Sequence, residues 1–191
     1  NENVWTRPNP VDTRKFEVSN NSDRLTARQK ISTASENDIL VIYVTKYLNR
    51  NKHSFLLEVL AKLPARFKLV LAGPALEDRD LAPSLKADQI PMLKQRANAL
   101  GIGDRVEITH GFIDMVEYLA AADVFCFPAQ DGGMRTPLLE ALSSGTPIVA
   151  NVDEPSFGEW IIDGENGYLA PLNAEQWASA VQAAAEFGET Q

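Results

Sequence analysis

The sequence predicts an α/β protein built on a parallel sheet with helices on both faces. Short apolar runs rich in β-branched residues alternate with segments of helical periodicity, and Gly, Pro or Asp separates most of them. The runs are apolar at consecutive positions, which is typical of parallel strands buried on both faces. With 191 residues, 45% of them hydrophobic and 23% charged, the chain is long enough for one domain with a sizeable core.

The elements are expected in a regular order along the chain. Strands are expected at 39–44, 67–72, 106–109, 123–127, 148–150 and 168–170. Helices are expected at 55–63, 87–100, 115–121, 136–143 and 174–187, with a helical turn at 157–162. This alternation predicts βαβ units and therefore a Rossmann-like parallel sheet.

The first 34 residues differ from the rest. Pro8, Pro10 and the run Asn20-Asn21-Ser22 interrupt any regular period. We therefore expect residues 1–34 to form an extended lead-in segment that packs on the domain, and residues 35–191 to form the domain itself.

Composition narrows the class of partner and the compartment. A net charge of −8 argues against nucleic acid as a partner, because phosphate neutralisation needs a basic surface. Cys126 is the single cysteine, so we expect a buried structural thiol and a reducing compartment. The first residues lack the pattern of a signal peptide, and no apolar run approaches the roughly 18 residues of a spanning helix. A soluble, cytoplasmic protein is expected.

A glycine-rich turn is the first candidate site. Gly132 and Gly133 follow the fourth expected strand, and a helix follows them. Thr136 suits the N-cap of that helix and Pro137 its first helical position. Such a turn presents backbone N–H groups beside the positive end of the helix dipole, at the sheet edge where ligands bind in α/β proteins. The spacing alone fits an anion-binding loop and a tight connection without ligand about equally.

Glu140 is the carboxylate nearest to this turn on the helix, and we place it in the helix's first turn. A glutamate there is favoured by the helix dipole whatever its task. Its functional interpretation is an acceptor for the vicinal hydroxyls of a ribose or a sugar.

A basic segment follows the first strand. Lys46, Arg50 and Lys52 place three cations within seven positions of an acidic chain. Their location at the ligand-binding edge of the sheet suits a diphosphate, and a solvated basic loop is the alternative.

Metal binding has little support in the sequence. Asp78 and Asp80 lie in a long charged loop without a nearby histidine, and His53 and His110 have no partner at ligand spacing. We therefore expect no metal and no resident cofactor.

Taken together, the motifs resemble the C-terminal domain of the GT-B glycosyltransferases of family 4, the group 1 enzymes. Residues 8–16 look like the segment where the chain enters that domain. Four further segments match in order and spacing, namely 121–125, 139–142, 145–150 and 158–169. The resemblance covers essentially the whole chain.

The resemblance implies a retaining glycosyltransferase of the hexosyltransferase type, with a nucleotide-diphosphate sugar as donor and no metal. Lys46 and Lys52 match the basic pair that holds the donor diphosphate and stabilises the departing nucleoside diphosphate. Glu140 would accept hydrogen bonds from the ribose, and Ile113 would contact the base. The backbone facing the phosphates and the sugar would come from Met134, Arg135, Thr136 and Pro137.

Two departures from the family pattern concern the same site. The usual pair of glutamates has seven residues between its members, which puts the first at Gly132. Either Asp131 takes over through a shifted loop, or the loop lacks that carboxylate. Lys46 stands where arginine is common, which keeps the charge and loses the bidentate geometry.

The resemblance also implies partners. The N-terminal acceptor domain would precede Pro8 and is absent from this chain, so the chain alone should bind a donor without transferring the sugar. A glycan or lipid-linked acceptor is expected, with possible peripheral membrane association of the full-length enzyme in polysaccharide biosynthesis. The alternatives are a nucleotide-sugar epimerase of the same fold and a non-catalytic nucleotide-binding α/β module. A receiver-like module would carry paired acidic residues after the first strand, where this chain carries cations.

Overall fold

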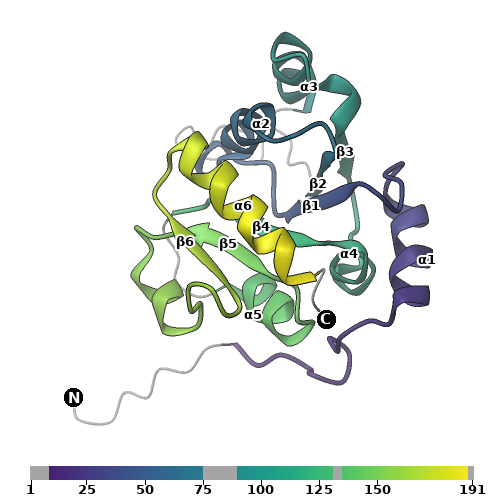
Figure 1. Cartoon of the computed structure of the whole chain (residues 1–191), viewed down its shortest axis with the longest axis vertical. Helices are drawn as coiled ribbons and strands as arrows, with labels where there is room; N and C mark the ends of the chain where they lie inside the picture. Colours follow the sequence, from purple (N-terminus) through teal and green to yellow (C-terminus); the bar gives the residue numbers. More distant parts are fainter. Residues whose placement is uncertain (1–8, 75–89, 131–134, 189–191) are drawn as a thin grey trace.

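A six-stranded parallel sheet forms the centre of the computed structural model, which describes residues 9–74, 90–130 and 135–188 (Figure 1). The strand order is β3-β2-β1-β4-β5-β6, and every neighbouring pair is parallel. The strands are β1 (Ile39–Val44), β2 (Phe67–Gly73), β3 (Val106–His110), β4 (Val124–Phe127), β5 (Ile148–Asn151) and β6 (Gly167–Ala170). The predicted Rossmann-like α/β fold is confirmed.

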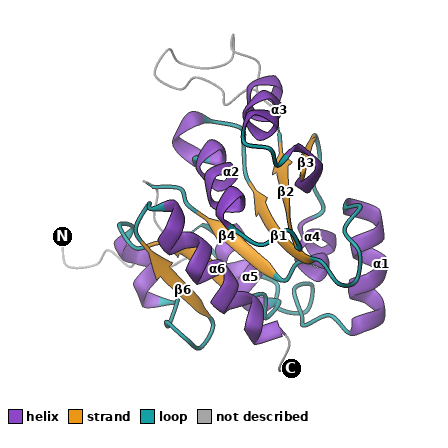
Figure 2. Ribbon diagram, turned by 45° about the horizontal axis from the view of Figure 1, so that its top comes forward, coloured by secondary structure: helices purple, strands orange, loops and turns teal. Residues whose placement is uncertain are grey.

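Helices cover both faces of this sheet (Figure 2). They are α1 (Asn21–Ile31), α2 (His53–Lys62), α3 (Ile90–Ala99), α4 (Met115–Ala121), α5 (Thr136–Ser143) and α6 (Ala174–Gly188). Short 3-10 turns are η1 (Asn49–Asn51), η3 (Gly103–Arg105) and η4 (Pro155–Glu159). Helix α2 packs against α3 and α6, whereas α4 packs against α1 and α5. The two helix layers enclose the sheet.

The direction in which the strands are added reverses between β1 and β4. From β1 the chain adds β2 and β3 on one side, and from β4 it adds β5 and β6 on the other. The two central strands pair through Val41 with Val124 and Ile42 with Phe125. Such a reversal places ligands outside the carboxyl ends of the strands that flank it. We call this part of the sheet the β1–β4 edge.

The core explains why the strand predictions succeed. All six residues of β1 are buried, as are all four of β4 and of β5. Trp177 of α6 is fully buried and meets Phe55 of α2 edge-on, with the ring centroids 5.4 Å apart. Cys126 is fully buried in β4, which confirms the structural thiol, and burial raises its pKa.

The expectation of an extended lead-in is wrong for residues 21–31, which form α1. Asn20, which seemed to interrupt a period, is the N-cap of this helix, and its side chain accepts a hydrogen bond from the backbone N–H of Asp23 at 3.0 Å. The helix has few apolar residues to create a periodic signal. Ala27 and Ile31 are buried in the core, and polar contacts add to this packing.

Those contacts come from three charged residues that we call the α1 anchor: Arg24, Arg28 and Asp123. Arg28 is only 2% exposed, and its Nη2 atom lies 2.5 Å from Asp123 Oδ2. The same guanidinium donates to the carbonyl oxygens of Ser35 and Asp38 at 3.1 and 2.9 Å. Arg24 pairs with the other oxygen of Asp123. The lead-in therefore packs on the domain through buried charge.

Candidate functional site

The two clusters singled out in the sequence flank the β1–β4 edge. The chain leaves β1 at Val44 and passes directly into the basic segment that begins at Lys46. It leaves β4 at Phe127 and returns into α5 at Thr136. Of the expected donor-binding residues in between, four lie outside the described residues: Asp131, Gly132, Gly133 and Met134. The site is therefore built from the basic segment and α5.

The basic segment is held in place by buried polar contacts. Asn51 is 3% exposed, and its Nδ2 atom donates to the carbonyl oxygen of Lys46 at 2.7 Å and to Thr45 Oγ1 at 3.1 Å. The hydroxyl of buried Tyr43 donates to the carbonyl oxygen of Asn51 at 2.8 Å. These bonds fix the backbone on both sides of Arg50, which distinguishes the segment from a loosely solvated loop. The sequence had not singled out Asn51.

Lys52 adopts an unusual backbone conformation. Its φ of 61° and ψ of 33° make it the one non-glycine residue with positive φ among those the structure describes. A side chain in this left-handed region costs about 1–2 kcal/mol. The residue is the N-cap of α2, so its backbone places the lysine beside the positive end of that helix. Phosphate groups are stabilised at such a position.

Lys46 and Lys52 are left available to a ligand by the rest of the fold. Lys46 is exposed and Lys52 half-buried. Within the described ranges neither ammonium group forms an ion pair with a carboxylate. Two unpaired cations near the N-terminus of α2 match the chemistry of a diphosphate.

Behind this segment lies a buried histidine, His53, with its ring stacked on Tyr47 and tilted against Tyr43 at centroid distances of 4.7 and 5.0 Å. Burial lowers the pKa of His53 to about 3. Tyr47 in turn donates its hydroxyl to the carbonyl oxygens of Leu71 and Thr109 at 2.8 and 2.6 Å. The aromatic group therefore supports the basic segment from within, and a neutral His53 adds no charge to the site.

Helix α5 begins one residue earlier than the expected cap implies, at Thr136 itself. Its N-cap is Arg135, with an extended backbone and no side-chain capping bond, and Thr136 is the first helical residue. Pro137 is consequently the second helical residue and not the first. The Thr136 hydroxyl accepts a hydrogen bond from Asn9 Nδ2 at 3.2 Å, so it contacts the lead-in and does not cap its own helix. The prediction of a Thr136 cap is wrong by this one position.

The same shift corrects the placement of Glu140. With α5 starting at Thr136, Glu140 lies beyond the first turn, which carries no acidic residue. The helix dipole falls off within the first turn and so accounts less well for this glutamate. Glu140 is half-buried; burial raises its pKa, and the nearby charge of Lys15 opposes that rise. We refer to Lys46, Lys52 and Glu140 together as the edge charges.

Ile113 lies at the carboxyl end of β3, two strands away from β1 in the sheet. Its side chain is half-buried and packs against the core. The preceding Phe112 is 97% exposed, next to Gly111 with φ of 119°. Ile113 therefore shares the carboxyl edge with the edge charges.

The structure adds the lead-in to the site, which sequence reasoning had treated only as a domain entry. Beyond the contact between Asn9 and Thr136, the carbonyl oxygen of Phe16 accepts a hydrogen bond from Ser143 Oγ at 2.6 Å. The lead-in thus runs along α5 from its first residue to its last. No local pattern in residues 9–16 signals these contacts, because their partners on α5 lie more than a hundred positions away.

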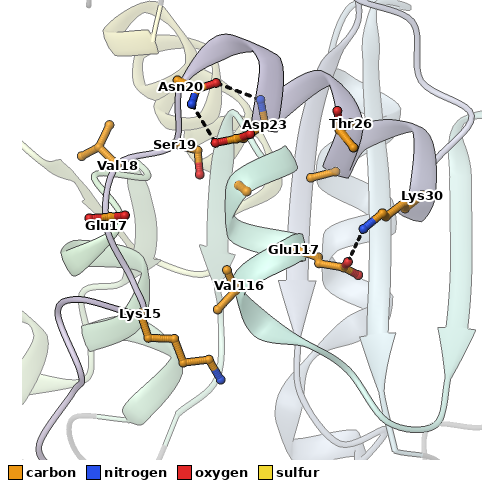
Figure 3. Close-up of a pocket in the computed structure, with 12 residues that line it drawn as sticks. Lys15, Glu17, Val18, Ser19, Asn20, Asp23, Thr26, Lys30, Val116 and Glu117 are labelled. Carbon is orange, nitrogen blue, oxygen red and sulfur yellow. Dashed lines mark hydrogen bonds and ion pairs between the residues drawn. The ribbon is translucent and has the colours of Figure 1, made fainter.

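A cavity of about 410 Å³ lies between the lead-in, α1 and α4 (Figure 3). Two internal pairs occupy part of its polar lining: Lys30 with Glu117 at 2.7 Å, and Asn20 with Asp23 at 2.7 Å. Lys15 is among the residues that line this cavity, whereas Lys46, Lys52 and Glu140 are not. Among the described residues, the cavity therefore shares none of the edge charges with the predicted donor site.

Metal and membrane features can be assessed only for the residues with described positions. Among these, no group of three or more His, Cys, Asp or Glu side chains could hold a metal ion. Asp78 and Asp80 lie outside them. In the same part of the chain no helix is both long and apolar enough to cross a membrane. Metal independence of the reaction stays a prediction.

Comparison with known proteins gives the family. A family model described as glycosyl transferases group 1 matches residues 26–191. A protein of Haemophilus influenzae described as an uncharacterized glycosyltransferase is 26% identical over 165 residues, covering 83% of this chain and 43% of its own length. The chain belongs to the group 1 glycosyltransferases.

Two solved structures share the fold. The Anabaena protein Alr3699/HepE, crystallised with UDP and glucose, superposes with a TM-score of 0.80 at 23% identity, covering 95% of this chain and 47% of that one. The C-terminal domain of a group 1 family protein (LpcC) from Francisella tularensis superposes with a TM-score of 0.68 at 22% identity, covering 95% and 98%. The chain therefore spans about half the length of the longer proteins it matches and nearly all of an isolated C-terminal domain.

Proposed function

We propose that this chain is the donor-binding C-terminal domain of a retaining, family 4 glycosyltransferase of GT-B fold. The full-length enzyme would move a hexose from a nucleotide-diphosphate sugar to a glycan or lipid-linked acceptor. One observation carries the proposal: the edge charges follow the two strands at the strand-order reversal, with two lysines after β1 that pair with no described carboxylate and a half-buried glutamate on the helix after β4. A nucleotide sugar needs cations for its diphosphate and an acceptor for its ribose hydroxyls.

Each edge charge has a role in this proposal. When the sugar leaves, the bond between its anomeric carbon and the diphosphate oxygen breaks, and negative charge grows on the diphosphate. Lys46 and Lys52 attract that charge more strongly in the transition state than in the bound donor, which lowers the barrier. Glu140 accepts hydrogen bonds from the ribose and holds the nucleotide in place. Two cations and the N-termini of α2 and α5 would supply the positive charge for which other transferases use a metal.

The match to an isolated C-terminal domain and the half-length match to longer relatives support the assignment to the donor half. The UDP and glucose named for the Anabaena protein support a nucleotide sugar as the donor. In this proposal the acceptor is bound by a second domain, and the reaction takes place between the two. A lipid-linked acceptor would bring the full-length enzyme to a membrane surface.

Calorimetric titration of this chain tests the proposal. UDP, GDP and ADP would be compared with their monophosphates and with UDP-, GDP- and ADP-sugars. We expect one nucleoside diphosphate to bind clearly better than its monophosphate, and no sugar transfer by the chain alone. Absence of binding to every nucleotide at millimolar concentration would contradict a donor site. Transfer at ordinary enzyme rates would contradict the division of labour between two domains.

A further inference from the structure

The lead-in reaches the predicted donor site through one hydrogen bond. The side-chain amide of Asn9 donates from Nδ2 to the hydroxyl oxygen of Thr136 at 3.2 Å, across 127 positions of the chain. Thr136 is half-buried and is the first residue of α5, which follows β4 at the β1–β4 edge. A residue at the domain entry therefore contacts a hydroxyl at the start of the helix that carries Glu140.

The rest of the lead-in is also held on α5. Phe16 is 6% exposed, and its carbonyl oxygen accepts a hydrogen bond from Ser143 Oγ at 2.6 Å. Between Asn9 and Phe16 the chain makes a turn, in which the backbone N–H groups of Lys15 and Phe16 both donate to the carbonyl oxygen of Asp12, at 3.0 and 3.1 Å. The amide of Asn9 is thus delivered by a segment that is fixed to the same helix further along.

The start of α5 has few backbone donors for a phosphate. Pro137 has no N–H. The N–H groups of Leu138 and Leu139 both donate to the carbonyl oxygen of Arg135, at 3.0 and 3.3 Å. Of the helical residues 136–139, Thr136 alone has a backbone N–H without an acceptor in the described part of the chain. Because a helix start normally binds an anion through several free N–H groups, the Thr136 hydroxyl is a needed further donor here.

The hydrogen bond from Asn9 determines what this hydroxyl can still do. A threonine hydroxyl has one O–H to donate and two lone pairs that accept. Inside a helix it can donate to the carbonyl oxygen four residues earlier, but no helical turn precedes Thr136. Among the residues with described positions the hydroxyl has no second partner. With one lone pair occupied by Asn9, its proton is directed away from Asn9 and is available to an acceptor such as a phosphate oxygen.

We propose that the Thr136 hydroxyl donates a hydrogen bond to the diphosphate of the nucleotide sugar, and that Asn9 is the positioning residue that orients this hydroxyl. The inference rests on the proposed function, because it takes a diphosphate as the ligand at the β1–β4 edge. Lys46 and Lys52 supply charge, whereas Thr136 supplies a directed donor. Since successive hydrogen bonds polarise one another, the bond from Asn9 also strengthens the one from Thr136 to the phosphate.

A double-mutant cycle on nucleoside diphosphate affinity tests this inference. Thr136→Val removes the hydroxyl at nearly constant shape and should weaken binding on the order of 10-fold, the lower end of the range for a hydrogen bond to a charged group. Asn9→Ala should weaken binding about 2- to 5-fold, because the hydroxyl remains but is free to rotate. The effect of Asn9→Ala should vanish in the Thr136→Val background and persist in Thr136→Ser, which keeps the hydroxyl. The losses should be confined to ligands that carry phosphates.

Ser143→Ala is the matched control. It removes the other hydrogen bond between the lead-in and α5 without touching Thr136, and it should leave diphosphate affinity unchanged. If the effect of Asn9→Ala persists in Thr136→Val, or if Ser143→Ala causes an equal loss, Asn9 only holds the lead-in on the helix and the positioning role is overturned. Thermal unfolding checks that each variant is folded.

The exposed position of Asn9 keeps the test decisive if Thr136→Val does not fold. In that case a loss in Asn9→Ala for the diphosphate and not for the nucleoside supports the inference, and no loss contradicts it. If Glu140→Ala and Lys46→Ala weaken diphosphate binding but Thr136→Val does not, the donor site stands and only this inference fails. If no nucleotide binds to the unsubstituted chain at millimolar concentration, the proposed function fails and this inference fails with it.

Discussion

The α1 anchor and the edge charges lie at opposite edges of the sheet and differ in how their charge is satisfied. In the anchor, the carboxylate of Asp123 receives two guanidinium groups and the backbone N–H of Leu40, and the cluster is largely buried. The edge charges are exposed or half-buried, and no described carboxylate pairs with either lysine. The paired charges of the anchor hold α1 on the domain. The edge lysines, which pair with no described carboxylate, are suited to binding a ligand.

This comparison predicts that substitutions in the anchor lower the free energy of unfolding, whereas substitutions of the edge charges weaken ligand binding. The largest effect is expected at the anchor. Asp123→Ala leaves two arginines and one backbone N–H without their partner, one of the arginines being buried. Removing one member of a buried ion pair costs about 3–5 kcal/mol of the free energy of unfolding. Urea denaturation measures this loss directly.

Glu117→Ala is the matched control for the anchor, because it breaks an exposed pair between α4 and Lys30 of α1. An exposed pair contributes only about 0–1 kcal/mol. If Asp123→Ala were no more destabilising than Glu117→Ala, the anchor would not hold α1 in the way proposed. Asp123→Asn, which keeps one acceptor oxygen, should fall between the two.

The next effect is expected at Glu140, on binding and not on stability. Glu140→Ala should weaken nucleoside diphosphate binding by roughly 1.5–3 kcal/mol, the usual contribution of hydrogen bonds to a charged group. The free energy of unfolding should not fall, because burial disfavours the charged carboxylate and no described cation forms an ion pair with it. Calorimetric titration measures the affinity, and Glu36→Ala at the opposite sheet edge is the control. Equal losses for ribose and dideoxyribose ligands would mean that Glu140 does not contact the ribose.

The sequence predictions succeed where an element carries local signals and fail where it depends on residues far along the chain. Strand β1 and helices α4 and α5 begin and end where expected, because buried apolar runs and flanking Gly, Pro or Asp residues are local signals. Helix α1 was missed because Arg28 is held by the side chain of Asp123 and the carbonyl oxygen of Ala121, which are distant in sequence. The basic segment was found through its charge. Its buried support at Asn51, and the contact of Asn9 with α5, left no local signature.

A smaller effect is expected for the two lysines. Lys46→Ala and Lys52→Ala should each weaken diphosphate binding by about 1–2 kcal/mol at low salt and affect nucleoside binding much less. Both ammonium groups are reachable by solvent, so the difference should shrink as salt rises. Titrations of a nucleoside and its diphosphate at two salt concentrations measure this, with Lys62→Ala on the far end of α2 as the control. Equal losses for the two ligands would make the segment a solvated loop after all.

The smallest expected effect separates stability from binding at a single residue. Lys52 has a left-handed backbone that glycine adopts without strain. Lys52→Gly should therefore raise the free energy of unfolding by about 0.5–1 kcal/mol, after allowing for the greater freedom of glycine in the unfolded chain. The same substitution should weaken diphosphate binding as much as Lys52→Ala, since both remove the ammonium group. Lys52→Ala keeps the strain and should not be stabilised. Urea denaturation and titration of the two variants give the comparison. A loss of stability in Lys52→Gly would mean that the lysine side chain supports the fold, and Lys52 would then belong with the anchor rather than with the edge charges.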